Sequence, residues 1–141
     1  MAVESKAEAT WQGDLMSGSG SVKPASGSFP ELALTWKRRA EEREGGTSPE
    51  ELIAAAHAGC FSMALSHGLA QAGHKADRLT TSVSVGFQPG EGITGIQIRV
   101  RGKVPGLDDA GFKTAAQDAG QNCPVSKALA GTTITVEAAL E

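Results

Sequence analysis

The stretch S48-P-E-E-L-I-A-A-A-H-A-G-C60-F-S-M-A-L65 decides the fold, because it predicts one long helix that is apolar or small on nearly every side. Ser48 is a favourable N-cap, Pro49 suits the first helical position, and Glu51 completes a capping box. Gly73 suits the end, which gives a helix of about 24 residues and roughly 36 Å. Helices that are apolar all round are buried, so we expect a buried central helix.

Alternating apolar residues on both sides of this helix predict β-strands. Before the helix, residues 7–11 and 32–36 alternate, and the Gly-, Ser- and Pro-rich stretch 17–28 between them predicts a loop within a meander. After the helix, residues 79–87 and 96–102 predict a β-hairpin that turns between them.

The rest of the chain predicts two shorter helices and a last strand. Asp108 or Asp109 should cap the first of these helices, Cys123-Pro124 should begin the second, and residues 134–140 alternate as a strand. The expected fold class is α+β, with antiparallel sheets around a long buried central helix, in a single domain that covers residues 1–141.

Composition excludes several classes of partner. The chain has 141 residues, no tyrosine and a formal net charge of -3, which does not suggest a nucleic-acid or membrane partner. The first residues lack the features of a signal peptide, and we expect no apolar run that approaches the roughly 20 residues of a membrane span. We therefore expect a soluble, cytoplasmic protein whose cysteines are reduced.

The two cysteines have different surroundings. Cys60 lies within the long apolar helix, where a cysteine can simply be a small core residue. Cys123 precedes Pro124 and should sit at a helix N-terminus, where unpaired amide groups favour a thiolate. Cys123 could equally be a poor N-cap with no further role.

A metal site is the alternative use of these thiols. His57 and Cys60 share a helix face, Cys123 could be a third ligand, and His67 or His74 a fourth. The close ligand pairs of a structural zinc site are missing from this pattern, so we expect neither a metal nor another cofactor. No role is assigned to His57.

Glu50 is not needed for the capping box. It could simply complement the helix dipole, or it could hold a cation over the start of the helix. The candidate cations lie in the charged stretch that follows Trp36: Lys37, Arg38, Arg39 and Arg43. Most of the stretch 37–46 predicts a solvated loop. Because Trp36 closes an alternating strand, we expect Lys37 and Arg39 to point to the face opposite Trp36 and Arg38.

The helix motif S48–L65 and the motif N122-C123-P-V-S-K-A-L129 together resemble the OsmC/Ohr family of thiol-dependent peroxidases, and the run H57-A-G-C-F-S-M-A-L65 resembles its OsmC branch. The resemblance covers essentially the whole chain. It implies an intertwined homodimer whose two equivalent sites use residues of both chains. It places the peroxidatic cysteine on Cys60, the resolving cysteine on Cys123, the glutamate on Glu50 and the arginine on Arg39, next to Arg38.

The implied function is a cysteine peroxidase that reduces organic hydroperoxides, and hydrogen peroxide more weakly. Its steps would be a sulfenic acid on Cys60, a disulfide from Cys60 to Cys123, and reduction by an external dithiol, for which a lipoylated protein is one candidate. Apolar lining from Leu52, Ile53, Phe61 and Met63 would favour organic substrates, and the alternative is that these residues are plain core. The alternative is a dimeric, non-enzymatic protein that binds an apolar ligand and whose cysteines are inert.

Overall fold

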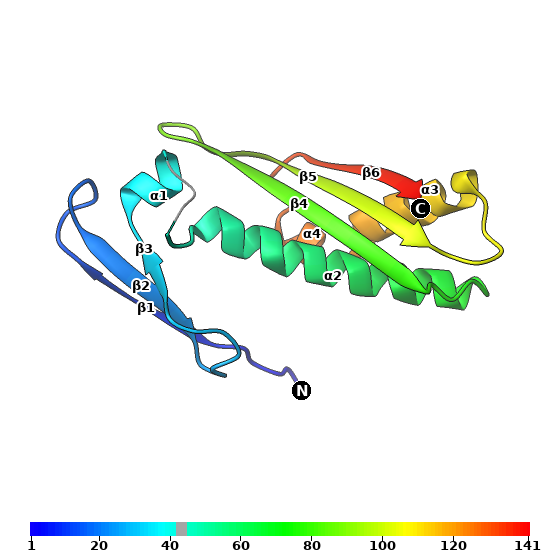
Figure 1. Cartoon of the computed structure of the whole chain (residues 1–141), viewed down its shortest axis with the longest axis horizontal. Coiled ribbons are helices and arrows are strands. Elements are labelled where there is room, and N and C mark those ends of the chain that lie inside the picture. The colour runs from blue at the N-terminus through cyan, green and yellow to red at the C-terminus, as the bar shows by residue number, and fades with distance from the viewer. Residues whose placement is uncertain (42–44) are drawn as a thin grey trace. The chain divides into compact units, whose positions relative to one another are not determined.

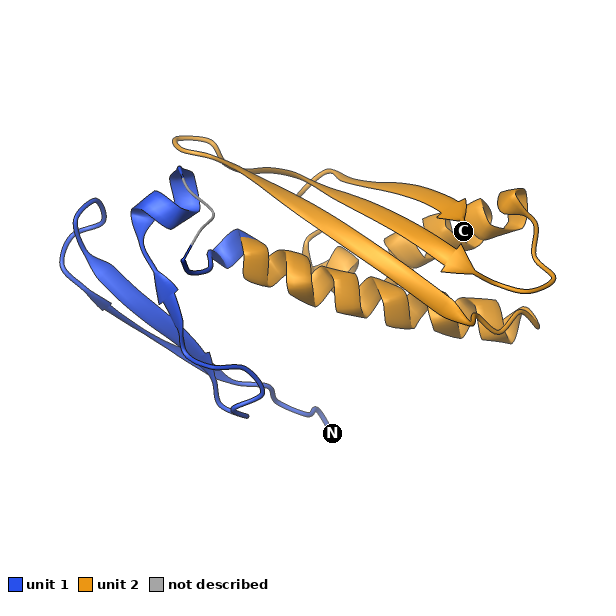
Figure 2. Ribbon diagram, viewed as in Figure 1, with its two compact units in different colours: residues 1–50 blue, residues 51–141 orange. Residues whose placement is uncertain are grey.

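The computed structural model describes residues 1–41 and 45–141 (Figure 1). The chain forms two compact units, Met1–Glu50 and Glu51–Glu141, and each is described by itself (Figure 2). In chain order the elements are β1 (Ala7–Gln12), β2 (Ser19–Pro24), β3 (Leu32–Leu34), α1 (Trp36–Ala40), α2 (Pro49–Gln71), β4 (Arg78–Gln88), β5 (Gly92–Lys103), α3 (Asp109–Asn122), α4 (Pro124–Ala128) and β6 (Ile134–Leu140).

The first unit contains an antiparallel sheet in the order β1-β2-β3, as a meander requires. Strands were expected at 7–11 and 32–36, and β1 and β3 confirm them in part. The predicted loop at 17–28 is wrong for residues 19–24, which form the central strand β2. Val22 is the one large apolar residue of β2, so this segment has no alternating apolar pattern. Its pairing with β1 and β3 makes it a strand.

The chain leaves β3 earlier than alternation predicts and enters the short helix α1. Thr35 is the N-cap of α1, and its hydroxyl accepts a hydrogen bond of 3.2 Å from the backbone N–H of Arg38. The prediction of a solvated loop from residue 37 is therefore wrong for α1. Because Trp36 and Arg39 are three residues apart on a helix, they share a face, and the strand alternation that set them on opposite faces is also wrong.

The helix α2 begins and ends as predicted. It begins at Pro49 and stops after Gln71, where Gly73 adopts a φ of 90° that favours glycine. The backbone N–H of His74 donates to the Leu69 carbonyl at 2.8 Å, and that of Gly73 donates to the Ala70 carbonyl at 3.0 Å. These two hydrogen bonds form a Schellman motif, which satisfies carbonyl groups at the end of the helix.

The second unit places α2 against a sheet in the order β4-β5-β6 (Figure 1). The predicted hairpin is confirmed by antiparallel β4 and β5, with a bulge between Gly86 and Phe87. The α+β class is also confirmed, but β6 pairs with β5 in parallel, where only antiparallel pairing was expected. The helices α3 and α4 return the chain to the end at which β5 starts, and such a crossover permits parallel pairing.

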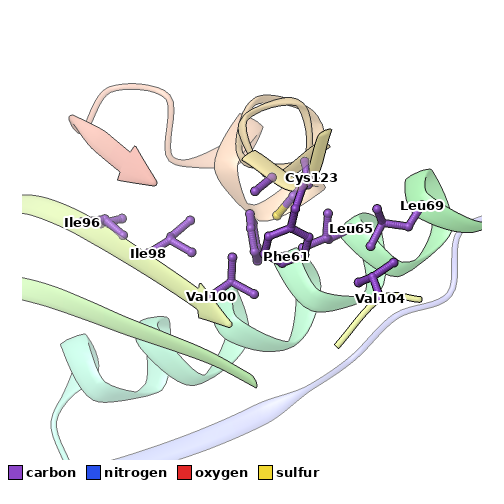
Figure 3. Packing of buried hydrophobic residues seen from close by; sticks show 11 residues of the cluster. Phe61, Leu65, Leu69, Ile96, Ile98, Val100, Val104 and Cys123 are labelled. Atoms are coloured by element: carbon purple, nitrogen blue, oxygen red, sulfur yellow. The ribbon is translucent and has the colours of Figure 1, made fainter. Parts of the chain in front are cut away.

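The core of the second unit lies between α2, α3 and the inward side of β5 (Figure 3). Phe61, Leu65 and Leu69 follow one another at four-residue spacing along α2 and are almost completely buried. They meet Ile96, Ile98 and Val100 of β5, together with Phe112 of α3 and Cys123. Alternate residues of β5, such as Arg99, are exposed, so one face of this sheet carries the core.

The opposite side of α2 is exposed, which differs from the expected burial all round. Ala55, Gly59, Met63 and Ser66 lie on it, and the Met63 side chain is 75% exposed. By length and composition alone α2 could cross a membrane, since the mean hydropathy of an 18-residue window within it is 1.3, so the expectation of no such run is wrong. The packing of its other face marks it as the core helix of the second unit.

A glycine in β5 allows this packing. A Cβ atom at Gly102 would lie 2.6 Å from Cζ of Phe112, whereas one at Gly131 would meet nothing within 4 Å. We expect Gly102→Ala to lower the free energy of unfolding by about 1–3 kcal/mol through overpacking, and Gly131→Ala to change it by less than about 0.5 kcal/mol. Urea denaturation measures both, and equal stabilities for the two variants would contradict the packing described.

Candidate active site

Two thiols meet inside the second unit. The sulfur of Cys60, on α2, lies 3.1 Å from the sulfur of Cys123, and both cysteines are free. Cys60 directly precedes the core residue Phe61 and is partly buried, while Cys123 is completely buried. The structure thus brings together two residues that are 63 positions apart in the sequence.

Cys123 lies where α3 ends and α4 begins. Its backbone N–H donates to the Ala119 carbonyl at 2.9 Å, and its carbonyl accepts from the backbone N–H of Lys127 at 3.1 Å. Its φ of -57° and ψ of 132° are the extended conformation that a residue before proline prefers. Pro124 occupies the first turn of α4, so the sulfur lies at the predicted helix N-terminus.

The same helix end acts differently on the two thiols. Burial alone would raise the pKa of Cys123, but the Ser126 amide, the Cys60 thiol, the Ser126 hydroxyl and the Val125 amide together outweigh it and lower this pKa. The Cys123 side chain makes no helix-capping hydrogen bond, and the amides of Val125 and Ser126 favour a negative charge on its sulfur. As pH rises, Cys123 is the first of the pair to ionise.

The pKa of Cys60 is raised instead. Burial is the main cause, and the neighbouring Cys123 adds to it, while the Val125 amide acts in the opposite direction. A proton shared between touching thiols stays on Cys60 when Cys123 is the thiolate. Of the described groups, none that acts on the Cys60 pKa is a cation.

Glu50 and Arg39 form a second pair, within the first unit. The guanidinium donates from Nε to Oε1 and from Nη2 to Oε2 of Glu50, both at 3.0 Å. Glu50 is 5% exposed, so its carboxylate requires such a partner. Of the cations that the sequence offered, Arg39 is thus one that pairs with Glu50, and the candidate Arg43 lies outside the described residues.

A pocket of about 320 Å³ borders this ion pair within the first unit. It is mostly apolar and is lined by Trp11, Leu15, Leu34, Thr35, Trp36, Arg39 and Pro49. Sequence reasoning missed it and named other apolar residues, among them Phe61, which is instead a fully buried core residue. The alternation around Trp11 and Leu34 was the available signal.

His57 also belongs to the buried polar groups of the second unit. Its Nε2 lies 2.7 Å from Oγ of Ser126, and it is completely buried. Burial lowers the pKa of this imidazole, which keeps the ring neutral. Sequence reasoning placed His57 beside Cys60 but could not find Ser126, although Ser126 follows Cys123 by the three residues typical of an N-cap contact. Over the described residues, no three His, Cys, Asp or Glu side chains gather as metal ligands do.

Comparison with known proteins places this geometry in a family. The model of the family described as OsmC-like protein matches residues 41–138. The chain is 40% identical over 132 residues to peroxiredoxin OsmC of Escherichia coli (strain K12), covering 92% of each chain. It is 39% identical over 89 residues to the organic hydroperoxide resistance protein of Xanthomonas axonopodis pv. citri (strain 306), covering 61% of each.

Solved structures agree with the sequence relatives. The crystal structure of the organic hydroperoxide resistance protein OhrB of Bacillus subtilis is similar with a TM-score of 0.68 and 27% identity, over 96% of this chain and 98% of that one. The fold and the match of the family model over most of the chain lead to one conclusion: the chain belongs to the OsmC-like protein family.

Proposed function

We propose that the protein is a cysteine-based peroxidase that detoxifies organic hydroperoxides and reduces hydrogen peroxide more weakly. The observation that carries the proposal is the contact of two free thiols, at 3.1 Å, with unequal surroundings. The names of the relatives, peroxiredoxin OsmC and organic hydroperoxide resistance protein, support a role in removing peroxides.

The proposed reaction has two steps at sulfur. The Cys60 thiolate attacks the terminal oxygen of the hydroperoxide, the O–O bond breaks, and an alcohol leaves after it takes up a proton. Cys60 is then a sulfenic acid. Cys123 attacks its sulfur, the S–O bond breaks, water is released and a disulfide forms. The contact between the sulfurs supports the second step, because little movement is needed to join them.

An external dithiol completes the cycle. It attacks the disulfide between Cys60 and Cys123 and is itself oxidised to a disulfide, which restores both thiols. A lipoylated protein is one such reductant. A reducing compartment such as the cytoplasm suits this chemistry, because the two cysteines must return to the free state after each turnover.

The raised pKa of Cys60 supports the proposal that a further group completes the site. Its causes are burial and the neighbouring Cys123, and a nucleophilic thiolate would need a positive charge beside it. We propose that a second copy of the chain supplies the guanidinium of its Arg39 in an intertwined homodimer. The exposed apolar face of α2, which includes Met63, supports such a partner.

In this proposal Arg39 stabilises the thiolate and orients the peroxide, and Glu50 holds Arg39 in position. Support comes from the two parallel hydrogen bonds, since a bidentate pair fixes the plane of a guanidinium as well as its location. The apolar pocket that borders Arg39 supports an organic substrate, because its two tryptophans and Leu15 could cover a hydrocarbon group.

The cysteine roles predict different defects. Cys60→Ser should abolish peroxide turnover, whereas Cys123→Ser should allow one rapid oxidation per chain and then stop unless a small thiol is added. Stopped-flow consumption of cumene hydroperoxide measures both, with the unsubstituted protein as control. Multiple turnover by Cys60→Ser at the normal rate would exclude the assignment.

The arginine role predicts a shift in pH dependence. Arg39→Ala removes a positive charge from the Cys60 thiolate and should raise the pKa of Cys60, so that oxidation at neutral pH slows by about tenfold or more. The rate of the first oxidation across pH measures this. Arg38→Ala is the matched control and should keep the original profile. An unchanged profile in Arg39→Ala would show that Arg39 does not act on Cys60.

The pocket predicts a change in selectivity. Leu15 lines it, and its neighbour Met16, which is also exposed, does not. Leu15→Ala should raise KM for cumene hydroperoxide about fivefold through lost apolar contact, and should leave the rate with hydrogen peroxide unchanged. Met16→Ala should affect neither. Equal effects of the two substitutions would show that the pocket does not hold the substrate.

A further inference from the structure

A polar ring occupies a core position of α2. His57 lies four residues before Phe61 and continues the buried row of Phe61 and Leu65, and it is as completely buried as they are. Its Nε2 meets Oγ of Ser126 at 2.7 Å, whereas its Nδ1 has no hydrogen-bond partner among the described residues. A buried group with an unsatisfied nitrogen destabilises the core, and such groups often have a functional role.

Ser126 connects this ring to a reactive thiol. It is the third residue of α4, whose N-cap is Cys123, and it is itself buried. Its hydroxyl lies in the first turn of the helix that Cys123 begins, and it is one of the groups that lower the pKa of the Cys123 thiol. The Ser126 hydroxyl therefore has two groups that can compete for its one proton: the His57 ring, at 2.7 Å, and the thiol of Cys123.

Which ring nitrogen of His57 carries the proton decides where the hydroxyl proton of Ser126 points. A neutral imidazole has one N–H group. If the proton is on Nε2, the ring donates to Oγ of Ser126, and the hydroxyl proton remains available to the sulfur of Cys123. If the proton is on Nδ1, Nε2 accepts from the hydroxyl and Cys123 loses this donor. A doubly protonated ring is disfavoured, because burial opposes the charge and Nδ1 has no described acceptor.

We propose that His57 is a positioning residue for Cys123: through its Nε2–H it turns the Ser126 hydroxyl toward the Cys123 sulfur and so keeps that sulfur ready to attack. The role in resolving a sulfenic acid on Cys60 rests on the proposed function. Neither His57 nor Ser126 touches the substrate in this role, and no proton is gained or lost by the pair.

Few other groups act on the Cys123 sulfur. The described titratable group that does so is the Cys60 thiol of α2, and the remaining contribution comes from the amides of Val125 and Ser126. Lys127, the charged residue of α4, is exposed. Removal of Cys60 therefore leaves the hydroxyl, the ring and these two amides, and the amides stay the same in all the variants compared below.

The test is a thiolate titration in the full-length Cys60→Ser protein. Cys123 is then the one cysteine, and the chain has no tyrosine, so ultraviolet absorbance of the thiolate is not obscured by tyrosinate. Adding Ser126→Ala should lower the thiolate-to-thiol ratio at a given pH roughly tenfold, the effect of one lost hydrogen bond to an anion. His57→Leu should give a comparable loss, and His57→Gln, which keeps an N–H donor, should restore much of it.

A purely structural His57 would behave differently. His57→Leu would then lower thermal stability while the Cys123 titration stayed unchanged, and this result would overturn the proposal. If His57→Leu does not fold, ¹⁵N NMR of the ring in the Cys60→Ser protein decides: Nε2–H while Cys123 is ionised supports the proposal, and Nδ1–H overturns it. Neither measurement uses peroxide. Absence of peroxidase activity in the unsubstituted protein would therefore refute the proposed function, but it would not change what the titration of Cys123 shows about His57.

Discussion

The packing of Phe61, Leu65 and Leu69 against β5 fixes the rotation of α2, and the position of Cys60 depends on that rotation. Burial of side chains this large contributes about 1.5–3 kcal/mol each, so the helix cannot turn about its axis without losing the core. One residue of rotation would carry Cys60 about 100° away. The reactive sulfur therefore takes its position from the same row of side chains that holds the second unit together.

A separate feature of the backbone, the break between α3 and α4, positions Cys123 beside Cys60. Pro124 prevents α3 from continuing, and the resulting break sets the Cys123 sulfur at the start of α4. The amides there favour a negative charge on Cys123, and a charge on Cys123 disfavours one on Cys60. The contact that suits disulfide formation thus opposes ionisation of the attacking thiol. This conflict is the physical reason to propose Arg39 from a second chain, held by the buried Glu50.

Much of this arrangement follows from local sequence. Pro49 and Gly73 carry enough capping information to locate α2, and Cys123-Pro124 locates the break before α4. The strand β2 and the parallel pairing of β6 could not be predicted, because both depend on partners elsewhere in the chain. Sequence alternation past Trp36 misplaced Arg39, since the N-cap at Thr35 starts a helix there.

The same distinction holds at the site. Both cysteines and Glu50 stood out by their neighbours in sequence, whereas the contact of His57 with Ser126 joins residues 69 positions apart and leaves no local signal. The central claim is that Cys60 and Cys123 act together. Its most direct measurement is the number of free thiols per chain before and after one equivalent of cumene hydroperoxide, with mass spectrometry of the product. We expect loss of both thiols and one disulfide within the chain, and two thiols that remain free would contradict a joint role of Cys60 and Cys123.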